Sequence, residues 1–185
     1  ICMALFHRER TGKGQYIDVS MMDGAITWLY AAMSDYFVSG TVPERGETRL
    51  DGQFAFYNVY ETKDGKYMTV GASELKFWKR LCELIDKEEW IALHEGPANV
   101  QEQLKKDLGE LFKTHDQQHW INLLAQEETC VGPVYDIEDM FSDPHITERD
   151  MFQEMQHPVA GMIQQIGFPI KFSETSGEIS NHAPG

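Results

Sequence analysis

Apolar residues recur three or four positions apart in several stretches of the chain, the spacing of one face of an α-helix. This pattern predicts helices over residues 21–39, 74–85 and 100–112. Ser73 stands where an N-cap would accept a backbone N–H group, so it predicts the start of the helix at Glu74. Thr114, with Gln117 three residues later, resembles a capping box that opens a further helix through residue 126.

Runs of aromatic and β-branched residues alternate with these helical patterns. Residues 54–61 and 66–71 flank Asp64-Gly65, a dipeptide that tolerates the positive φ angles of a tight turn, so we expect an antiparallel hairpin. Residues 15–20 are predicted to form a further strand, and residues 130–134 a short strand or extended segment. After residue 151 the chain consists of strand-like pieces. Residues 40–52 lack periodicity and predict a linker. The mixture predicts the α+β fold class.

The first residues of the chain have the pattern of the second half of a helix. Residues 1–6 are apolar and lead to Arg8, Arg10 and Gly12, without an N-cap residue before them. A signal peptide would show its charged region first and a cleavage site afterwards. We therefore expect the chain to be a fragment of a longer protein.

Charge and cysteine content exclude several classes of function. The chain has 30 acidic and 16 basic residues, so its formal net charge is −14, which repels nucleic acid and anionic lipid. Its longest apolar stretch contains Asp23 and Asp35, which disfavours a membrane span. Three widely spaced cysteines indicate reduced thiols in a cytoplasmic protein and no structural metal site.

Short motifs offer little chemistry by themselves. Residues 12–15 read Gly-Lys-Gly-Gln, but the glycines run from a helix into a strand, so a helix stop is favoured over a phosphate loop. His115 and His119 share a helical face without a glutamate base or a third ligand, so a solvated face is favoured over a zinc site. Glu74 lies at a strand–helix junction, where the helix dipole alone favours a carboxylate.

Several ordered motifs resemble the class III CoA-transferase family, which includes α-methylacyl-CoA racemases, formyl-CoA transferases and carnitine CoA-transferases. The motifs, in chain order, are residues 3–15, 17–25, 50–52, 56–57, 60–66, 70–74, 77–78, 130–134, 143–145 with Arg149, and 157–161. They extend over nearly the whole chain.

The resemblance implies an architecture. Members of this family have a large Rossmann-like domain, a smaller domain from the middle of the chain, and two subunits that interlock as rings. Residues 1–49 would be the end of the large domain and a linker, residues 50–160 the small α+β domain, and residues 161–185 a return linker. The catalytic aspartate, the partner histidine of racemases and most groups that hold the CoA phosphates would lie outside this chain.

The resemblance also implies site residues. Glu74 matches the glutamate that supports the catalytic histidine of racemases, so it would orient a histidine outside this chain. Gly52, Gln53 and Tyr57 would contact the substrate, although Gln53 and the two residues after it replace the small residues and proline often seen there. We therefore expect a racemase-like acyl-CoA enzyme.

Two alternatives stay open. One is CoA transfer between carboxylic acids through an aspartyl anhydride, and the other is a docking and dimerisation module without chemistry of its own. If the protein is an enzyme of either kind, we expect the full-length protein to be a homodimer with a coenzyme A thioester as substrate. A free carboxylic acid is a possible second substrate. We expect no permanently bound cofactor.

Overall fold

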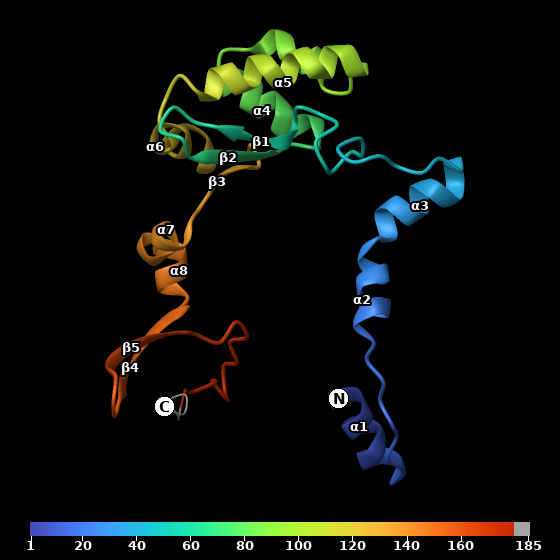
Figure 1. Ribbon diagram of the computed structural model, residues 1–185, viewed down its shortest axis with the longest axis vertical. Coiled ribbons are helices and arrows are strands. Elements are labelled where there is room, and N and C mark those ends of the chain that lie inside the picture. Colours follow the sequence, from blue (N-terminus) through green and yellow to red (C-terminus); the bar gives the residue numbers. More distant parts are fainter. Residues whose placement is uncertain (180–185) are drawn as a thin grey trace.

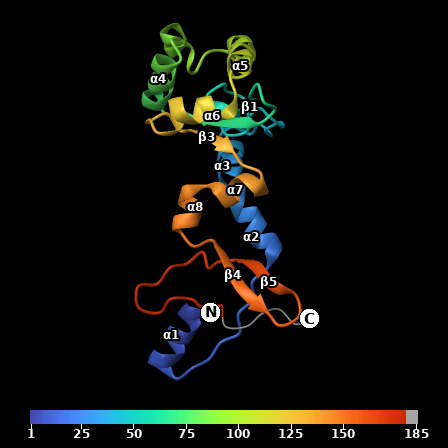
Figure 2. The ribbon, with the colours of Figure 1, turned by 90° about the vertical axis from the view of Figure 1, so that its left-hand side faces the viewer.

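The computed structural model describes residues 1–179. It consists of a packed central part and two arms, and both arms leave the central part on the same side (Figures 1 and 2). The first arm contains α1 (Cys2–Thr11), α2 (Met21–Trp28) and α3 (Tyr30–Ser39). The central part contains β1 (Tyr57–Glu61), β2 (Tyr67–Gly71), α4 (Leu75–Leu84), the 3₁₀-helix η1 (Glu88–Leu93), α5 (Ala98–Phe112), α6 (Gln117–Trp120), the π-helix η2 (Ile121–Ala125) and β3 (Val131–Val134). The second arm contains α7 (Ile137–Ser142), α8 (Pro144–Glu148), β4 (Phe152–His157) and β5 (Gly161–Ile166). The predicted α+β class is confirmed.

A three-stranded antiparallel sheet organises the central part. Its order is β1-β2-β3, so β2 pairs with the strand before it and with β3, which follows only after the helices. The predicted hairpin and the extended segment at residues 130–134 are both confirmed. Side chains of β2 alternate in exposure, with Met68 and Val70 buried and Tyr67 and Thr69 exposed. The sheet therefore has one buried and one open face.

The hairpin turn differs from the tight turn that Asp64-Gly65 predicts. Glu61 pairs with Tyr67, so residues 62–66 form a longer loop, and of the two turn residues only Gly65 has a positive φ, at 74°. Asp64 instead accepts a hydrogen bond from the Thr62 hydroxyl at 2.5 Å and another from the backbone N–H group of Gln117 at 3.2 Å. The loop is therefore held both by a local bond, from Thr62, and by a bond from the distant Gln117.

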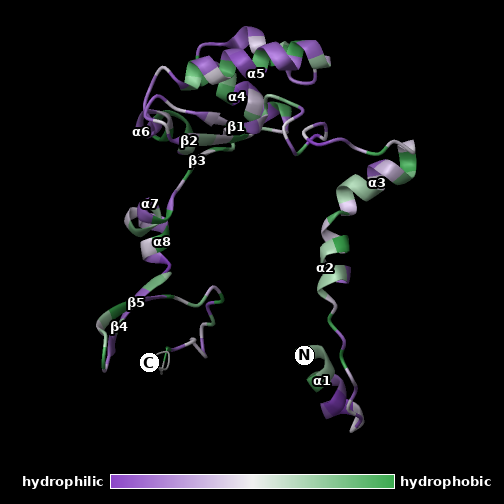
Figure 3. Cartoon of the chain, viewed as in Figure 1, coloured by the Kyte–Doolittle hydropathy of each residue, from purple (hydrophilic) through white to green (hydrophobic). Residues whose placement is uncertain are grey.

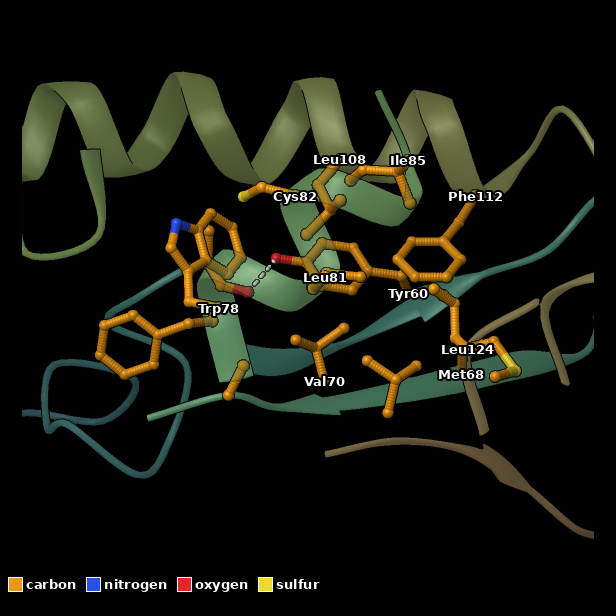
Figure 4. Packing of buried hydrophobic residues seen from close by; sticks show 14 of the residues in the cluster. Tyr60, Met68, Val70, Trp78, Leu81, Cys82, Ile85, Leu108, Phe112 and Leu124 are labelled. Carbon is orange, nitrogen blue, oxygen red and sulfur yellow. Dashed lines mark hydrogen bonds between the residues drawn. The ribbon is translucent and has the colours of Figure 1, made fainter. Parts of the chain in front are cut away.

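Helices α4 and α5 cover the buried face of the sheet, and apolar side chains fill the space between the two layers (Figure 4). Within residues 1–179, the buried apolar side chains all lie between Ala55 and Val131. Polar atoms in this core have partners: the indole of Trp78 donates to the Trp90 carbonyl at 3.0 Å, and the Tyr60 hydroxyl donates to the Ala55 carbonyl at 2.7 Å. Burial raises the pKa of Tyr60, so its hydroxyl stays protonated.

The helix that follows the hairpin is confirmed, but its predicted cap is wrong. Glu74 is the N-cap residue of α4, and no side chain caps this helix. The Ser73 hydroxyl donates instead to the Glu74 carboxylate at 3.1 Å.

The helix predicted from Thr114 through residue 126 appears as α6 followed by the π-helix η2, without the capping box. Asp116 is the N-cap residue, because the Thr114 hydroxyl is engaged with the Leu111 carbonyl at 2.6 Å. The Gln117 side chain reaches the sheet, where it donates to the carbonyls of Tyr67 at 2.7 Å and Val134 at 3.2 Å.

In the first arm, the strand predicted at residues 15–20 is absent. Its side chains point into solvent, with Tyr16 91% and Val19 84% exposed, and no described strand lies beside it to form a ladder. The single helix predicted over residues 21–39 is divided at Leu29 into α2 and α3. The Thr27 hydroxyl bonds the Gly24 carbonyl at 2.6 Å, a local contact that bends helices. The interpretation of Gly12 as a helix stop is confirmed, because it closes α1 with a φ of 70°.

Neither arm packs into the core. Helices α2 and α3 contain no buried residue, although Figure 3 shows them as predominantly apolar. These two helices therefore form no compact unit with the hairpin, whereas the end of the linker contacts the central part through Arg49. Among residues 1–179, no helix combines the length and apolar character needed to cross a membrane. In the second arm Asp136 caps α7 in a capping box with Asp139. The domain division at residues 1–49, 50–160 and 161–185 stays a prediction.

The side chain of Gln101 on α5 bonds two other segments of the central part, so its replacement tests this fold. Its side chain, 2% exposed, accepts from the N–H group of Ala55 at 3.0 Å and donates to the carbonyls of Leu93 at 2.7 Å and His94 at 3.2 Å. Gln101→Met should lower the free energy of unfolding by about 1–3 kcal/mol, because it leaves buried backbone groups unpaired. Urea unfolding followed by tryptophan fluorescence measures this.

Gln103→Met is the matched control, because Gln103 lies on the same helix, is exposed, and bonds only the Asp107 carboxylate among the described residues. Equal unfolding midpoints for the two variants would contradict the role of Gln101.

Candidate functional site

The open face of the sheet carries a hollow of about 440 Å³. This face is directed away from α4 and α5, toward the side from which the two arms extend (Figure 1). The hollow is lined by Leu50, Asp51, Gly52, Tyr57, Asn58, Val59, Thr69, Val70, Gly71 and Cys130. It therefore joins the end of the linker, the hairpin and the residue before β3.

Strand register explains where the hollow forms. Tyr57 pairs with Gly71, and Val59 pairs with Thr69. The N–H group of Gly71 donates to the Cys130 carbonyl at 2.9 Å, which brings the third segment alongside. A Cβ atom at Gly71 would lie 3.4 Å from that carbonyl and 4.0 Å from the Tyr57 ring, so glycine keeps this part of the floor open.

The loop of residues 50–52 forms one wall. Gly52 has a φ of 108°, a conformation that L side chains rarely adopt, and its carbonyl accepts from the Lys105 ammonium at 3.2 Å. The Asp51 carboxylate accepts from the N–H group of Thr48 at 2.6 Å, which closes a short turn. The wall is thus held by a bond to the Gly52 carbonyl and by the turn that Asp51 closes.

The structure places two of the four predicted site residues in this hollow. Gly52 and Tyr57 line it, whereas Gln53 is exposed and is absent from its lining. Glu74 also lies outside the lining, exposed at the start of α4. Their roles stay predictions.

Cys130 connects Glu74 to the hollow electrostatically. Burial raises the pKa of the Cys130 thiol, and the charge of the Glu74 carboxylate raises it further. Cys130 also has a φ of 53°, which is unusual for a residue other than glycine. The sequence alone indicates no site role for Cys130, because nothing in its local pattern shows that it adjoins Gly71.

The other candidate motif does not build a site. The rings of His115 and His119 stack with centroids 4.0 Å apart, and both side chains are exposed. The described residues contain no group of three or more histidine, cysteine or acidic side chains that could hold a metal ion.

Comparisons with known proteins give a consistent assignment. The sequence model described as CoA-transferase family III matches residues 1–185. The chain is 30% identical to a succinyl-CoA:mesaconate CoA-transferase of Haloarcula hispanica over 188 residues, which is 100% of this chain and 47% of the relative. It is 32% identical to human alpha-methylacyl-CoA racemase over 152 residues, which is 82% of this chain and 40% of the relative.

A solved structure agrees. The crystal structure of a CAIB/BAIF family protein from Brucella suis superposes with a TM-score of 0.75 at 25% identity, and covers 100% of this chain and 48% of that one. The chain thus spans about half the length of the proteins it matches.

The effect of the Glu74 charge on the Cys130 thiol can be tested by alkylation. A raised pKa means less thiolate at pH 8, so Cys130 should react more slowly with iodoacetamide than an unperturbed thiol. Glu74→Gln removes a negative charge and lowers the pKa of Cys130, so the rate at pH 8 should rise roughly twofold, since charges in water interact by only about 1 kcal/mol even at 4 Å. Mass spectrometry of the Cys130 peptide measures the rate.

Glu110→Gln should leave this rate unchanged, because Glu110 does not contribute to the shift at Cys130. An unchanged rate in Glu74→Gln would show that the charge of Glu74 does not act on the Cys130 thiol.

Proposed function

Because this chain belongs to CoA-transferase family III, we propose that it is part of an acyl-CoA enzyme that exchanges the proton on the carbon α to a thioester, as a racemase would. The proposal rests on Glu74. Its carboxylate accepts from the Ser73 hydroxyl at 3.1 Å and forms no ion pair with any residue in the described range 1–179. An exposed carboxylate without a cation partner is available to an imidazole from outside the chain.

In this reaction a histidine and an aspartate outside the chain act on opposite faces of the α-carbon. One group removes the proton, leaving an enolate on the thioester, and the other returns a proton to the opposite face. Glu74 accepts the imidazole N–H, which holds the ring in one tautomer and stabilises the imidazolium. Gly52, Gln53 and Tyr57 contact the substrate.

CoA transfer between carboxylic acids is the second candidate. The Haloarcula relative named as a CoA-transferase matches the whole chain, which favours this reading. An aspartate outside the chain would attack the thioester carbonyl, expel CoA thiolate and form a mixed anhydride. The thiolate then attacks the aspartyl carbonyl and releases the donor acid, which leaves an aspartyl-CoA thioester. The acceptor acid attacks this thioester, expels the thiolate and forms a second anhydride, and attack of the thiolate on its acyl carbonyl gives the new acyl-CoA and frees the aspartate. No imidazolium forms on this path, so Glu74 would have no catalytic task.

We extend the proposal to the surroundings of the enzyme. It works in the cytoplasm as a homodimer, takes a coenzyme A thioester as substrate, and binds no cofactor permanently. In the transferase reading it also takes a free carboxylic acid. The exposed apolar residues of the first arm, such as Trp28 at 85% and Phe37 at 73%, support burial against further protein.

The two reactions predict different effects of Glu74→Gln in the longer protein. For a racemase, the fold should persist, because the loss of the helix-dipole interaction amounts to about 0.3–1 kcal/mol. Exchange of the α-proton should fall by about tenfold or more, because an amide no longer stabilises the imidazolium. For a transferase, CoA transfer should stay nearly intact. Deuterium incorporation at the α-carbon and CoA transfer between two acids are measured on wild type and mutant, and normal α-exchange in the mutant would remove Glu74 from the mechanism.

A separate prediction concerns the chain of 185 residues by itself. It should neither bind coenzyme A tightly nor turn over an acyl-CoA, because its net charge of −14 repels the polyanionic ligand and the proposed acid and base lie elsewhere. Isothermal titration calorimetry measures binding, and a dissociation constant in the low micromolar range would contradict the prediction.

A further inference from the structure

Arg49, at the end of the linker, makes four contacts with the central part. Its Nη1 atom pairs with the Glu95 carboxylate at 2.7 Å, and its Nη2 atom donates to the Ser73 carbonyl at 3.0 Å. The guanidinium also lies 5.1 Å from the ring centroid of Phe56 and 5.8 Å from that of Phe54. One side chain therefore contacts three separate segments.

Two of the segments joined by Arg49 are parts of the candidate site. Residues 50–52, which follow Arg49 directly, form one wall of the hollow. Ser73 directly precedes Glu74, and its hydroxyl bonds the Glu74 carboxylate at 3.1 Å. The bond from Arg49 to the Ser73 carbonyl thus links the wall of the hollow to the segment that carries Glu74.

A second set of contacts supports the same junction. The His94 Nε2 atom lies 3.1 Å from the Ala72 carbonyl oxygen, and the His94 ring lies 4.3 Å from the Phe56 ring. The N–H group of Ala72 donates to the Phe56 carbonyl at 2.8 Å. Arg49 therefore binds at the exposed edge of a junction that is packed and hydrogen-bonded on its buried side.

Surface exposure limits what this arginine adds to stability. The side chains of Arg49 and Glu95 are 47% and 58% exposed, and exposed ion pairs contribute little to the free energy of folding. Its effect on the relative position of the segments is larger, because the planar guanidinium reaches Glu95 and Ser73 with two different nitrogens while it lies near two aromatic rings. A lysine presents a single nitrogen and cannot reproduce this arrangement.

From this arrangement we propose that Arg49 is a positioning residue of the candidate site, which holds the wall at residues 50–52 in register with Glu74. The proposal rests on the proposed function for its effect on the reaction, but its structural part can be tested without it. Arg49 acts through these two segments and does not itself contact the substrate.

Hydrogen–deuterium exchange on the chain tests the structural part. In Arg49→Lys and Arg49→Gln, backbone amides of residues 48–53 and 72–77 should exchange at least about threefold faster, because both segments lose a shared anchor. Arg80→Gln is the matched control, since Arg80 pairs with Glu127 at 2.6 Å and is 40% exposed, but lines no part of the hollow. Unchanged exchange in both Arg49 variants would overturn the proposal.

Kinetics of the longer protein test the functional part. Arg49→Gln should raise KM for the acyl-CoA and lower kcat, each by about tenfold, because misplacement of contact groups by even 1 Å is costly. The KM and kcat of Arg49→Lys should lie between those of Arg49→Gln and wild type, and those of Arg80→Gln should match wild type. A purely structural role would lower apparent kcat through the folded fraction at constant KM, and that result would overturn the proposal.

The failure of the two hypotheses can be told apart. A longer wild-type protein without α-exchange or CoA transfer would overturn the proposed function, while faster exchange in the Arg49 variants would still show that Arg49 holds the two segments. Normal wild-type activity together with unchanged KM in Arg49→Gln would overturn the positioning role and leave the proposed function intact.

Discussion

The central part depends on one constraint: a three-stranded sheet whose apolar face must be covered by the chain segment between its second and third strands. β2 pairs with β1 across the loop of residues 62–66, but β3 reaches β2 only after the helices from α4 to η2 have crossed the buried face. Trp78, Leu81 and Phe112, contributed by these helices, are nearly inaccessible to solvent. Covering one face in this way leaves the other face open, and the hollow lies there.

Buried polar side chains connect this core to the loops around the site. Gln101 bonds Ala55, just after the wall of the hollow, and Gln117 bonds the carbonyls of β2 and β3. A buried amide that loses its partners is costly, so each glutamine specifies the position of the segments it joins. The loops at the hollow are therefore set by the same contacts that stabilise the helices.

The hollow offers shape and Glu74 offers an exposed carboxylate outside its lining, while the acid and base of the proposed reaction would lie outside this chain. This division agrees with a chain that spans 47% of its haloarchaeal relative and 40% of the human racemase. Glu74 and Arg49 therefore have different proposed roles. A change at Glu74 distinguishes the two reactions, because only the racemase path forms an imidazolium that this carboxylate would stabilise. A change at Arg49 tests the geometry on which either reaction would depend.

Sequence alone determined the features that arise from local patterns. Helical spacing predicted α4 and α5, and runs of aromatic and β-branched residues predicted the hairpin of β1 and β2, because each depends on residues a few positions apart. Resemblance to a family added Glu74, Gly52, Gln53 and Tyr57 as candidates. Two of these line the hollow.

Tertiary structure decided what depends on distant partners. Residues 15–20 alternate but have no neighbouring strand among the described residues, so the extended pattern alone did not produce one. Cys130 enters the site only because β3 pairs with β2, and Arg49 reaches Ser73 and Glu95 across 24 and 46 residues of sequence. Such contacts form only after the core brings the segments together, since the entropy lost in closing these long loops is offset by burial elsewhere.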